Sequence, residues 1–121
     1  MPDDVRAKAE SMWQEIMRFD APPVTDPYTA ATTDQVFGGL WTRPGLARRD
    51  RRLTSLTVIA TRGLREPLVA HLTAALSSGD LNADELHEWV LHLSFYAGWP
   101  IGATAYAALR EVLSHPTSAG K

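Results

Sequence analysis

Histidine, acidic and arginine side chains must supply most of the chemistry of this 121-residue chain, because it contains no cysteine. That absence removes disulfides, thiolate metal sites, cysteine nucleophiles and dithiol redox reactions, so thiol peroxidase activity is not expected. Four histidines are present, and an imidazole titrates near neutral pH, which suits it to general acid or base catalysis. They are the first candidates for a catalytic group.

Two histidines stand out by their surroundings. His71 lies among apolar residues at helical spacing, and His92 follows Glu88 by four residues. Residues four apart share one face of a helix, so a carboxylate at Glu88 is placed to orient the imidazole of His92. Two interpretations remain open for each histidine: a proton-transfer residue, or an ordinary packed or solvated side chain.

A cluster of arginines is the most specific feature of the charge pattern. Five arginines occur within ten residues of a chain whose net charge is −2: Arg43, Arg48, Arg49, Arg51 and Arg52. Guanidinium groups bind carboxylates through two parallel hydrogen bonds, which favours an anionic ligand. Pairing with acids of a neighbouring helix or subunit is the alternative. The net charge and the lack of interleaved aromatic residues argue against nucleic acid.

No metal or cofactor is predicted. Helical di-iron sites need a Glu-x-x-His pair on each of two helices, and only Asp84-x-x-His87 approaches that pattern, once. The pair Gly38-Gly39 lacks the preceding strand and the spacing of a nucleotide-binding loop.

Apolar residues at helical period predict an all-α fold. The expected helices cover 3–18, 27–41, 47–62, 67–78, 83–97 and 100–113, with Asn82 and Glu85 as a capping box before the fifth. No run alternates at period two, so we expect a single domain of about six helices over residues 1–121. No apolar run is long enough for a membrane span, and the acidic N-terminus does not resemble a signal peptide, which indicates a cytoplasmic protein.

Three sequence blocks occur in the order of a known family. They are VFGGLWTRPGLARRDRRL at 36–53, AHLTAAL at 70–76 and YAGWP at 96–100. Over about 34–112, with one extra residue near Asp80, the chain resembles the carboxymuconolactone decarboxylase family. The resemblance implies an alkylhydroperoxidase D-like helical fold that assembles into trimers or hexamers. It also implies a cofactor-free lyase of aromatic catabolism that converts 4-carboxymuconolactone to an oxoadipate enol-lactone.

The resemblance also assigns positions. The Cys-x-x-Cys-x-x-x-His motif of peroxidase-like relatives aligns with Leu64, Pro67 and His71, so the histidine is retained and both cysteines are absent. The decarboxylases carry an acid where this chain has Gly39, and their equivalent of His92 is often Gln. His92 therefore offers an additional acid or base that the family pattern does not require.

Decarboxylation of a lactone leaves a dienolate, so it needs cations for the substrate carboxylates, a donor to the developing oxyanion and an acid that protonates carbon. We expect His71 to be the central acid or base. We expect a second group to assist His71 in proton transfer. This group is either Tyr96 or His92, the latter oriented by Glu88. The substrate-binding candidates are Arg43 and Arg51, with Trp41 and Trp99 walling a pocket or an interface, or packing in the core.

Two functional classes remain open. The first is a small enzyme, either a decarboxylase of an anionic lactone or a relative that moves protons on another acidic substrate in a biosynthetic pathway. The second is a non-catalytic oligomeric binding or scaffold protein.

The short chain predicts self-association. Its aromatic-rich helices carry more apolar surface than one small core can cover, and the family resemblance agrees. We expect at least a trimer in solution, and light scattering at micromolar concentration measures this. A stable monomer there would contradict the prediction.

Overall fold

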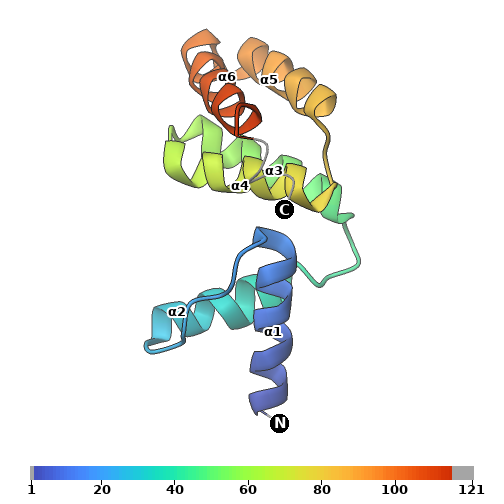
Figure 1. The fold of residues 1–121 in the computed structure, drawn as a ribbon, viewed down its shortest axis with the longest axis vertical. Coiled ribbons are helices and arrows are strands. Elements are labelled where there is room, and N and C mark those ends of the chain that lie inside the picture. The colour runs from blue at the N-terminus through green and yellow to red at the C-terminus, as the bar shows by residue number, and fades with distance from the viewer. Residues whose placement is uncertain (1, 116–121) are drawn as a thin grey trace. The chain divides into compact units, whose positions relative to one another are not determined.

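The computed structural model describes residues 2–115, and every regular element among them is helical (Figure 1). The prediction of an all-α chain with six helical segments is therefore confirmed for that part of the chain. The chain divides into two compact units, Met1–Ala47 and Arg48–Lys121, each with its own internal packing. The expectation of one domain over 1–121 stays a prediction.

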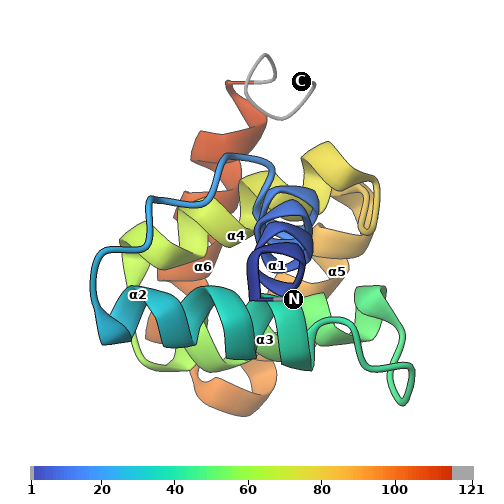
Figure 2. The same cartoon turned by 90° about the horizontal axis from the view of Figure 1, so that it is seen from below.

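The first unit contains α1 (Pro2–Met17), α2 (Pro27–Ala31) and the π-helix η1 (Thr32–Leu40). Figure 2 shows α2 continuing into η1 as one coil, where the sequence predicted a single α-helix over 27–41. The hydrogen bonding changes at Thr32, and at the end of η1 the Trp41 N–H donates to the Val36 carbonyl, five residues back, at 3.1 Å. Apolar spacing alone does not distinguish α-helical turns from π-helical turns, because both can place the same apolar residues on one face.

Small residues let α1 cross η1 closely. A Cβ atom at Gly38 would stand only 2.9 Å from the Cβ of Ala9, so glycine is required at this crossing. Trp13 packs on Phe37 with ring centroids 4.5 Å apart. Beside the crossing, Arg6 donates two hydrogen bonds to the Asp34 carboxylate, at 2.7 and 3.0 Å. These contacts hold the first unit together.

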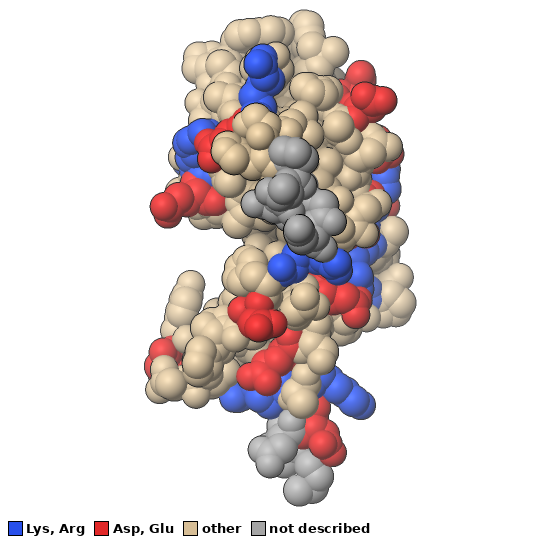
Figure 3. Space-filling model, in the orientation of Figure 1, with Lys and Arg blue, Asp and Glu red and all other residues tan. Residues whose placement is uncertain are grey.

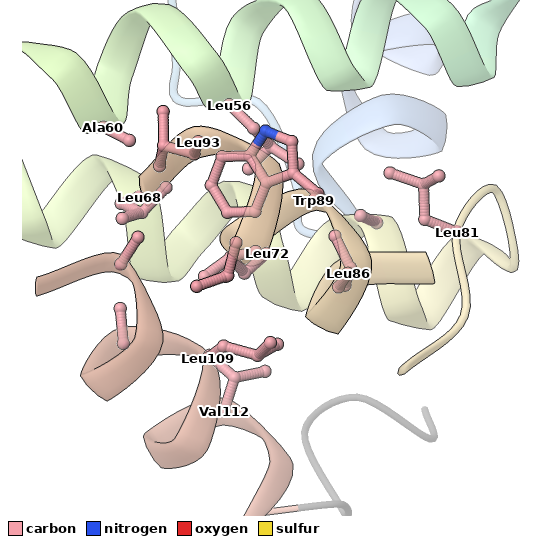
Figure 4. Packing of buried hydrophobic residues seen from close by; sticks show 14 residues of the cluster. Leu56, Ala60, Leu68, Leu72, Leu81, Leu86, Trp89, Leu93, Leu109 and Val112 are labelled. Atoms are coloured by element: carbon pink, nitrogen blue, oxygen red, sulfur yellow. The ribbon is translucent and has the colours of Figure 1, made fainter. Parts of the chain in front are cut away.

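The second unit contains α3 (Arg48–Thr61), α4 (Arg65–Ser78), α5 (Ala83–Ala97) and α6 (Trp99–Leu113). Each helix contributes at least one completely buried leucine to a common core, among them Leu56, Leu72, Leu86 and Leu109. Figure 4 shows these side chains converging, with the ring of Trp89 beside them. Burial of side chains of this size, each worth about 1.5–3 kcal/mol, is the main source of stability here.

The ends of α4 and α5 match the sequence signals. Gly79 ends α4 with φ 80°, a left-handed conformation that favours glycine. The predicted capping box of α5 is confirmed: Asn82 Oδ1 accepts from the Glu85 N–H at 2.8 Å, and Glu85 Oε1 accepts from the Asn82 N–H at 3.0 Å. Helix α5 therefore begins at a defined residue, and the helical repeat from that residue sets which positions share a face.

Helices α5 and α6 touch backbone to backbone. A Cβ atom at Gly102 would lie 1.8 Å from Ser94 Oγ and 2.9 Å from Ser94 Cα. The Ser94 hydroxyl is buried and donates to the Val90 carbonyl at 2.8 Å, so it cannot swing away freely. Position 102 has no room for a side chain.

Gly102→Ala should therefore lower the free energy of unfolding by about 1–3 kcal/mol, because α5 and α6 must separate to admit the methyl group. Gly39→Ala is the matched control, since a Cβ there meets nothing closer than 3.7 Å. Its gain in helix propensity makes it neutral or stabilising by up to about 1 kcal/mol. Urea unfolding measures both, and equal stabilities of the two variants would contradict the close crossing.

Candidate active site

An open groove of about 940 Å³ lies between α3 and α5, entirely within the second unit. Two bonds tie its walls together. Arg49 Nη2 donates to Glu85 Oε2 at 2.9 Å, and Trp89 Nε1 donates to Thr57 Oγ1 at 3.0 Å. The two helices therefore run in the same direction along the groove. Its lining residues are Arg49, Leu53, Thr57, Thr61, Leu81, Glu85, Glu88, Trp89, His92, Leu93, Tyr96 and Ala97.

Three of the predicted catalytic residues line this groove. Glu88, His92 and Tyr96 follow one another on α5 at intervals of four residues. The rings of His92 and Tyr96 are stacked, with centroids 4.9 Å apart and planes 5° from parallel. Tyr96 is 85% exposed, so this end of the groove is open to solvent. The structure thus brings together a carboxylate, an imidazole and a phenol above an apolar floor.

Arg49 and Glu85 are groove residues that the sequence did not single out as a pair. The sequence placed Arg49 in the arginine cluster and Glu85 in a helix cap. The signal that would have found them is the spacing of Arg49, Leu53 and Thr57, which marks one face of α3. Only the fold shows that this face meets α5.

His71 lies elsewhere, on α4, and it is not among the residues that line the groove. Its Nδ1 atom is buried and makes no hydrogen bond with any residue in 2–115. Burial, aided by the nearby charge of Arg52, lowers the pKa of His71 to about 4. The ring is therefore neutral at pH 7, and its role as the central acid or base stays a prediction.

Arg52, the charged residue near His71, belongs to a buried ion pair. Arg52 is completely buried, and its Nε donates to Asp80 Oδ2 at 2.9 Å. Its Nη2 reaches Ser78 Oγ at 3.4 Å. This pair therefore joins α3 to the turn that follows α4.

The remaining predicted substrate-binding residues belong to different units. Arg43 is exposed and Trp41 is buried, both within Met1–Ala47. Arg51 is partly buried on α3 and does not line the groove. Trp99 is 59% exposed, so it does not pack in the core, and it lies edge-on to Phe95 at 5.6 Å.

Trp99 helps to line a second hollow of about 490 Å³ between α5 and α6. Glu88 contributes to both hollows, because it lies between the two faces of α5. Most of the other lining residues here are apolar or aromatic, including Val90, Leu91 and Tyr106. This hollow offers less polar chemistry than the groove.

Other kinds of site find little support in the described structure. Within residues 2–115, no three histidine or acidic side chains gather closely enough to hold a metal ion. The described helices are all too short or too polar to cross a bilayer. On the face shown in Figure 3, acidic and basic side chains are interspersed, and neither sign forms a broad field.

Comparison with known sequences identifies the family. The profile of the carboxymuconolactone decarboxylase family matches residues 27–111, well over half of the chain. The protein therefore belongs to the carboxymuconolactone decarboxylase family, as the sequence blocks predicted, and the match begins earlier than the expected residue 34.

Two curated relatives are similar in sequence. A 4-carboxymuconolactone decarboxylase from Acinetobacter baylyi is 40% identical over 76 residues, which are 63% of this chain and 56% of that protein. Nitrosuccinic acid decarboxylase npaB from Metarhizium robertsii is 29% identical over 102 residues, which are 84% of this chain and 71% of that protein. The chain thus matches little more than half the length of the Acinetobacter relative.

Acid should destabilise the protein through His71. The folded pKa of about 4 lies below the ordinary value of 6.5, so the unfolded chain binds the proton first as the pH falls. The contribution of the neutral ring is complete above pH 6.5 and is lost between pH 6.5 and about 4, by roughly 3 kcal/mol at most.

Urea unfolding at pH 7 and pH 5 tests this. His71→Leu should lose less stability than the wild type between the two values, while His87→Leu, at an exposed position on α5, should follow the wild type. Identical pH dependence of all three proteins would contradict the assignment.

Proposed function

We propose that the protein is a cofactor-free decarboxylase of a small carboxylated lactone such as 4-carboxymuconolactone, and that the groove between α3 and α5 is its active site. The observation that carries this proposal is the alignment of Glu88, His92 and Tyr96 on the groove of a carboxymuconolactone decarboxylase family member. The relative from Acinetobacter baylyi, whose name states that reaction, supports the choice of substrate.

The reaction breaks one carbon–carbon bond. The bond between the ring carbon and its carboxylate breaks, CO₂ leaves, and the electron pair spreads into a dienolate that ends on the lactone carbonyl oxygen. A general acid then places a proton on carbon, and solvent returns a proton to that acid. The protein must therefore donate a hydrogen bond to the oxyanion and a proton to the carbon.

The groove residues divide these tasks. His92 is the proton donor, and Glu88, one helical turn earlier on the same face of α5, is placed to orient its imidazole. Tyr96 lies flat against the His92 ring, which restricts the ring plane, and its phenol is a donor for the oxyanion. The apolar floor of Leu53 and Leu93 weakens hydration of the carboxylate that is lost, which favours CO₂ release.

A second substrate has specific support. The Metarhizium robertsii relative, which matches a larger share of both chains, is named for nitrosuccinic acid. In that compound the nitro group takes up the electron pair that the lactone carbonyl takes up in the first case. The two substrates share one chemistry: a carboxylate lost next to an electron-withdrawing group. Two alternatives remain: a different acid/base reaction in a biosynthetic pathway, and a non-catalytic scaffold role. Neither of them would use this decarboxylation chemistry.

The proposal includes self-association. At the end of α5 and the start of α6, Phe95 is 73% exposed and Trp99 is 59% exposed, next to the exposed ring of Tyr96. Exposed aromatic residues in one place are typical of protein interfaces. A trimer or hexamer that covers them would also close the open end of the groove.

Steady-state kinetics on both acids tests the catalytic assignment. His92→Ala should lower kcat by about 10²-fold or more, because it removes the proton donor, and should leave the melting temperature nearly unchanged. His87→Ala, at the exposed histidine five residues earlier, is the matched control and should retain wild-type kcat.

His71→Ala separates the two histidine hypotheses. If His92 is the acid, His71→Ala changes the melting temperature more than it changes kcat. Unchanged kcat in His92→Ala, together with a large loss in His71→Ala, would contradict the assignment and return the role to His71.

A further inference from the structure

We propose that Arg49 binds the carboxylate that the substrate retains, and that Glu85 occupies Arg49 when no substrate is present. This inference rests on the proposed function and adds to it a specificity-determining residue, because Arg49 makes the groove selective for dicarboxylates over monocarboxylates. Both acids named above are dicarboxylates, and each keeps one carboxylate after CO₂ is lost.

Arg49 is the cation of the groove. Among the described residues that line it, Arg49 is the only Lys or Arg, whereas Glu85 and Glu88 are both carboxylates. A substrate carboxylate elsewhere in the groove would face those two negative charges with no guanidinium to offset them. The Arg49 end is therefore the favourable place for the carboxylate that the substrate retains.

The guanidinium of Arg49 retains donors for a ligand. Its Nη2 atom donates to Glu85 Oε2, while its Nη1 atom lies 3.7 Å from Asp50 Oδ1, beyond hydrogen-bond distance. The side chain is 48% exposed, so solvent and small molecules reach it. A carboxylate bound through two parallel hydrogen bonds would replace this single bond to Glu85.

Glu85 keeps its position without Arg49. Its Oε1 atom accepts from the Asn82 N–H, as part of the capping box that begins α5. The Asn82 backbone and the Arg49 side chain both lower the pKa of Glu85, so it is ionised at neutral pH. Glu85 is therefore a fixed internal carboxylate that competes with the substrate for one guanidinium.

The spacing along α5 relates this end to the proton donor. Glu88 and His92 lie three and seven residues beyond Glu85, about 4.5 and 10.5 Å of helix rise. A diacid held at Arg49 by one carboxylate extends along the groove, over the apolar floor and towards His92. The carboxylate that is lost thus lies away from the Arg49 guanidinium, over the apolar floor.

The chain offers a matched control for the ion pair. Arg65 pairs with Glu111 across α4 and α6, at exposures of 46% and 47%, outside the groove. The test measures the Kd of succinate and of butyrate by calorimetry, together with kcat and KM on both candidate acids, for wild type, Arg49→Gln, Glu85→Gln and Arg65→Gln. Succinate serves as the probe because it has two carboxylates and is not expected to react.

Arg49→Gln should raise the succinate Kd and the substrate KM by about tenfold or more, with kcat changed less than about threefold. Wild type should bind succinate more tightly than butyrate, and Arg49→Gln should lose that preference. Glu85→Gln preserves the capping box, because glutamine also accepts from Asn82, and should tighten succinate binding several-fold. Arg65→Gln should match the wild type.

The two proposals fail in different ways. If Arg49→Gln turns over substrate with an unchanged KM and an unchanged succinate Kd, the role of Arg49 is overturned. The proposal that the protein is a decarboxylase then stands. Arg49-dependent succinate binding without turnover of either acid supports Arg49 and overturns the decarboxylase. Three results overturn the inference. The first is wild-type protein that does not bind succinate at millimolar concentration. The others are weaker succinate binding in Glu85→Gln, and a loss of succinate affinity in Arg65→Gln equal to that in Arg49→Gln.

Discussion

The position of the Trp89 ring determines both the core and the groove of the second unit. The ring belongs to the buried cluster with Leu56 and Leu93 (Figure 4). It also lines the groove. Its indole N–H is held by Thr57, which ties α5 to α3 at this depth. A smaller residue would open the groove into the core and admit water beneath its polar side chains. The polar side chains above it would then lose the apolar surface that makes their charges effective.

The sequence predicts well what depends on neighbours along the chain. The cap at Asn82 and the shared face of Glu88 and His92 follow from spacing within one helix, and the structure shows both. The pairing of Arg49 with Glu85 depends instead on how α3 rotates against α5. Among five neighbouring arginines the sequence favoured Arg43 and Arg51 for binding an anion, because residue type alone does not show which guanidinium lines the groove. Contacts between distant elements are therefore the part of the site that sequence spacing cannot supply.

The two histidines chosen from the sequence show the same limit. His71 was chosen because the sequence resemblance aligned it with a family histidine, yet it is largely buried and next to a buried guanidinium, which disfavours its charged form. His92 lies on the groove and stacks on Tyr96. Residue type marked both as candidates, whereas solvent access and neighbouring charge separate them. The π-helical hydrogen bonding of η1 was equally hidden, because an apolar stripe does not record which carbonyl each N–H meets.

The buried pair of Arg52 and Asp80 constrains how this sequence could have arisen. A guanidinium at a completely buried position is costly unless a carboxylate is already beside it. Asp80, at 19% exposure, keeps contact with water and is tolerable alone. Gain of the acid before gain of the base is therefore the accessible order of mutation, because the reverse order buries a guanidinium without this carboxylate. Descendants of this chain can lose the arginine first, but not the aspartate.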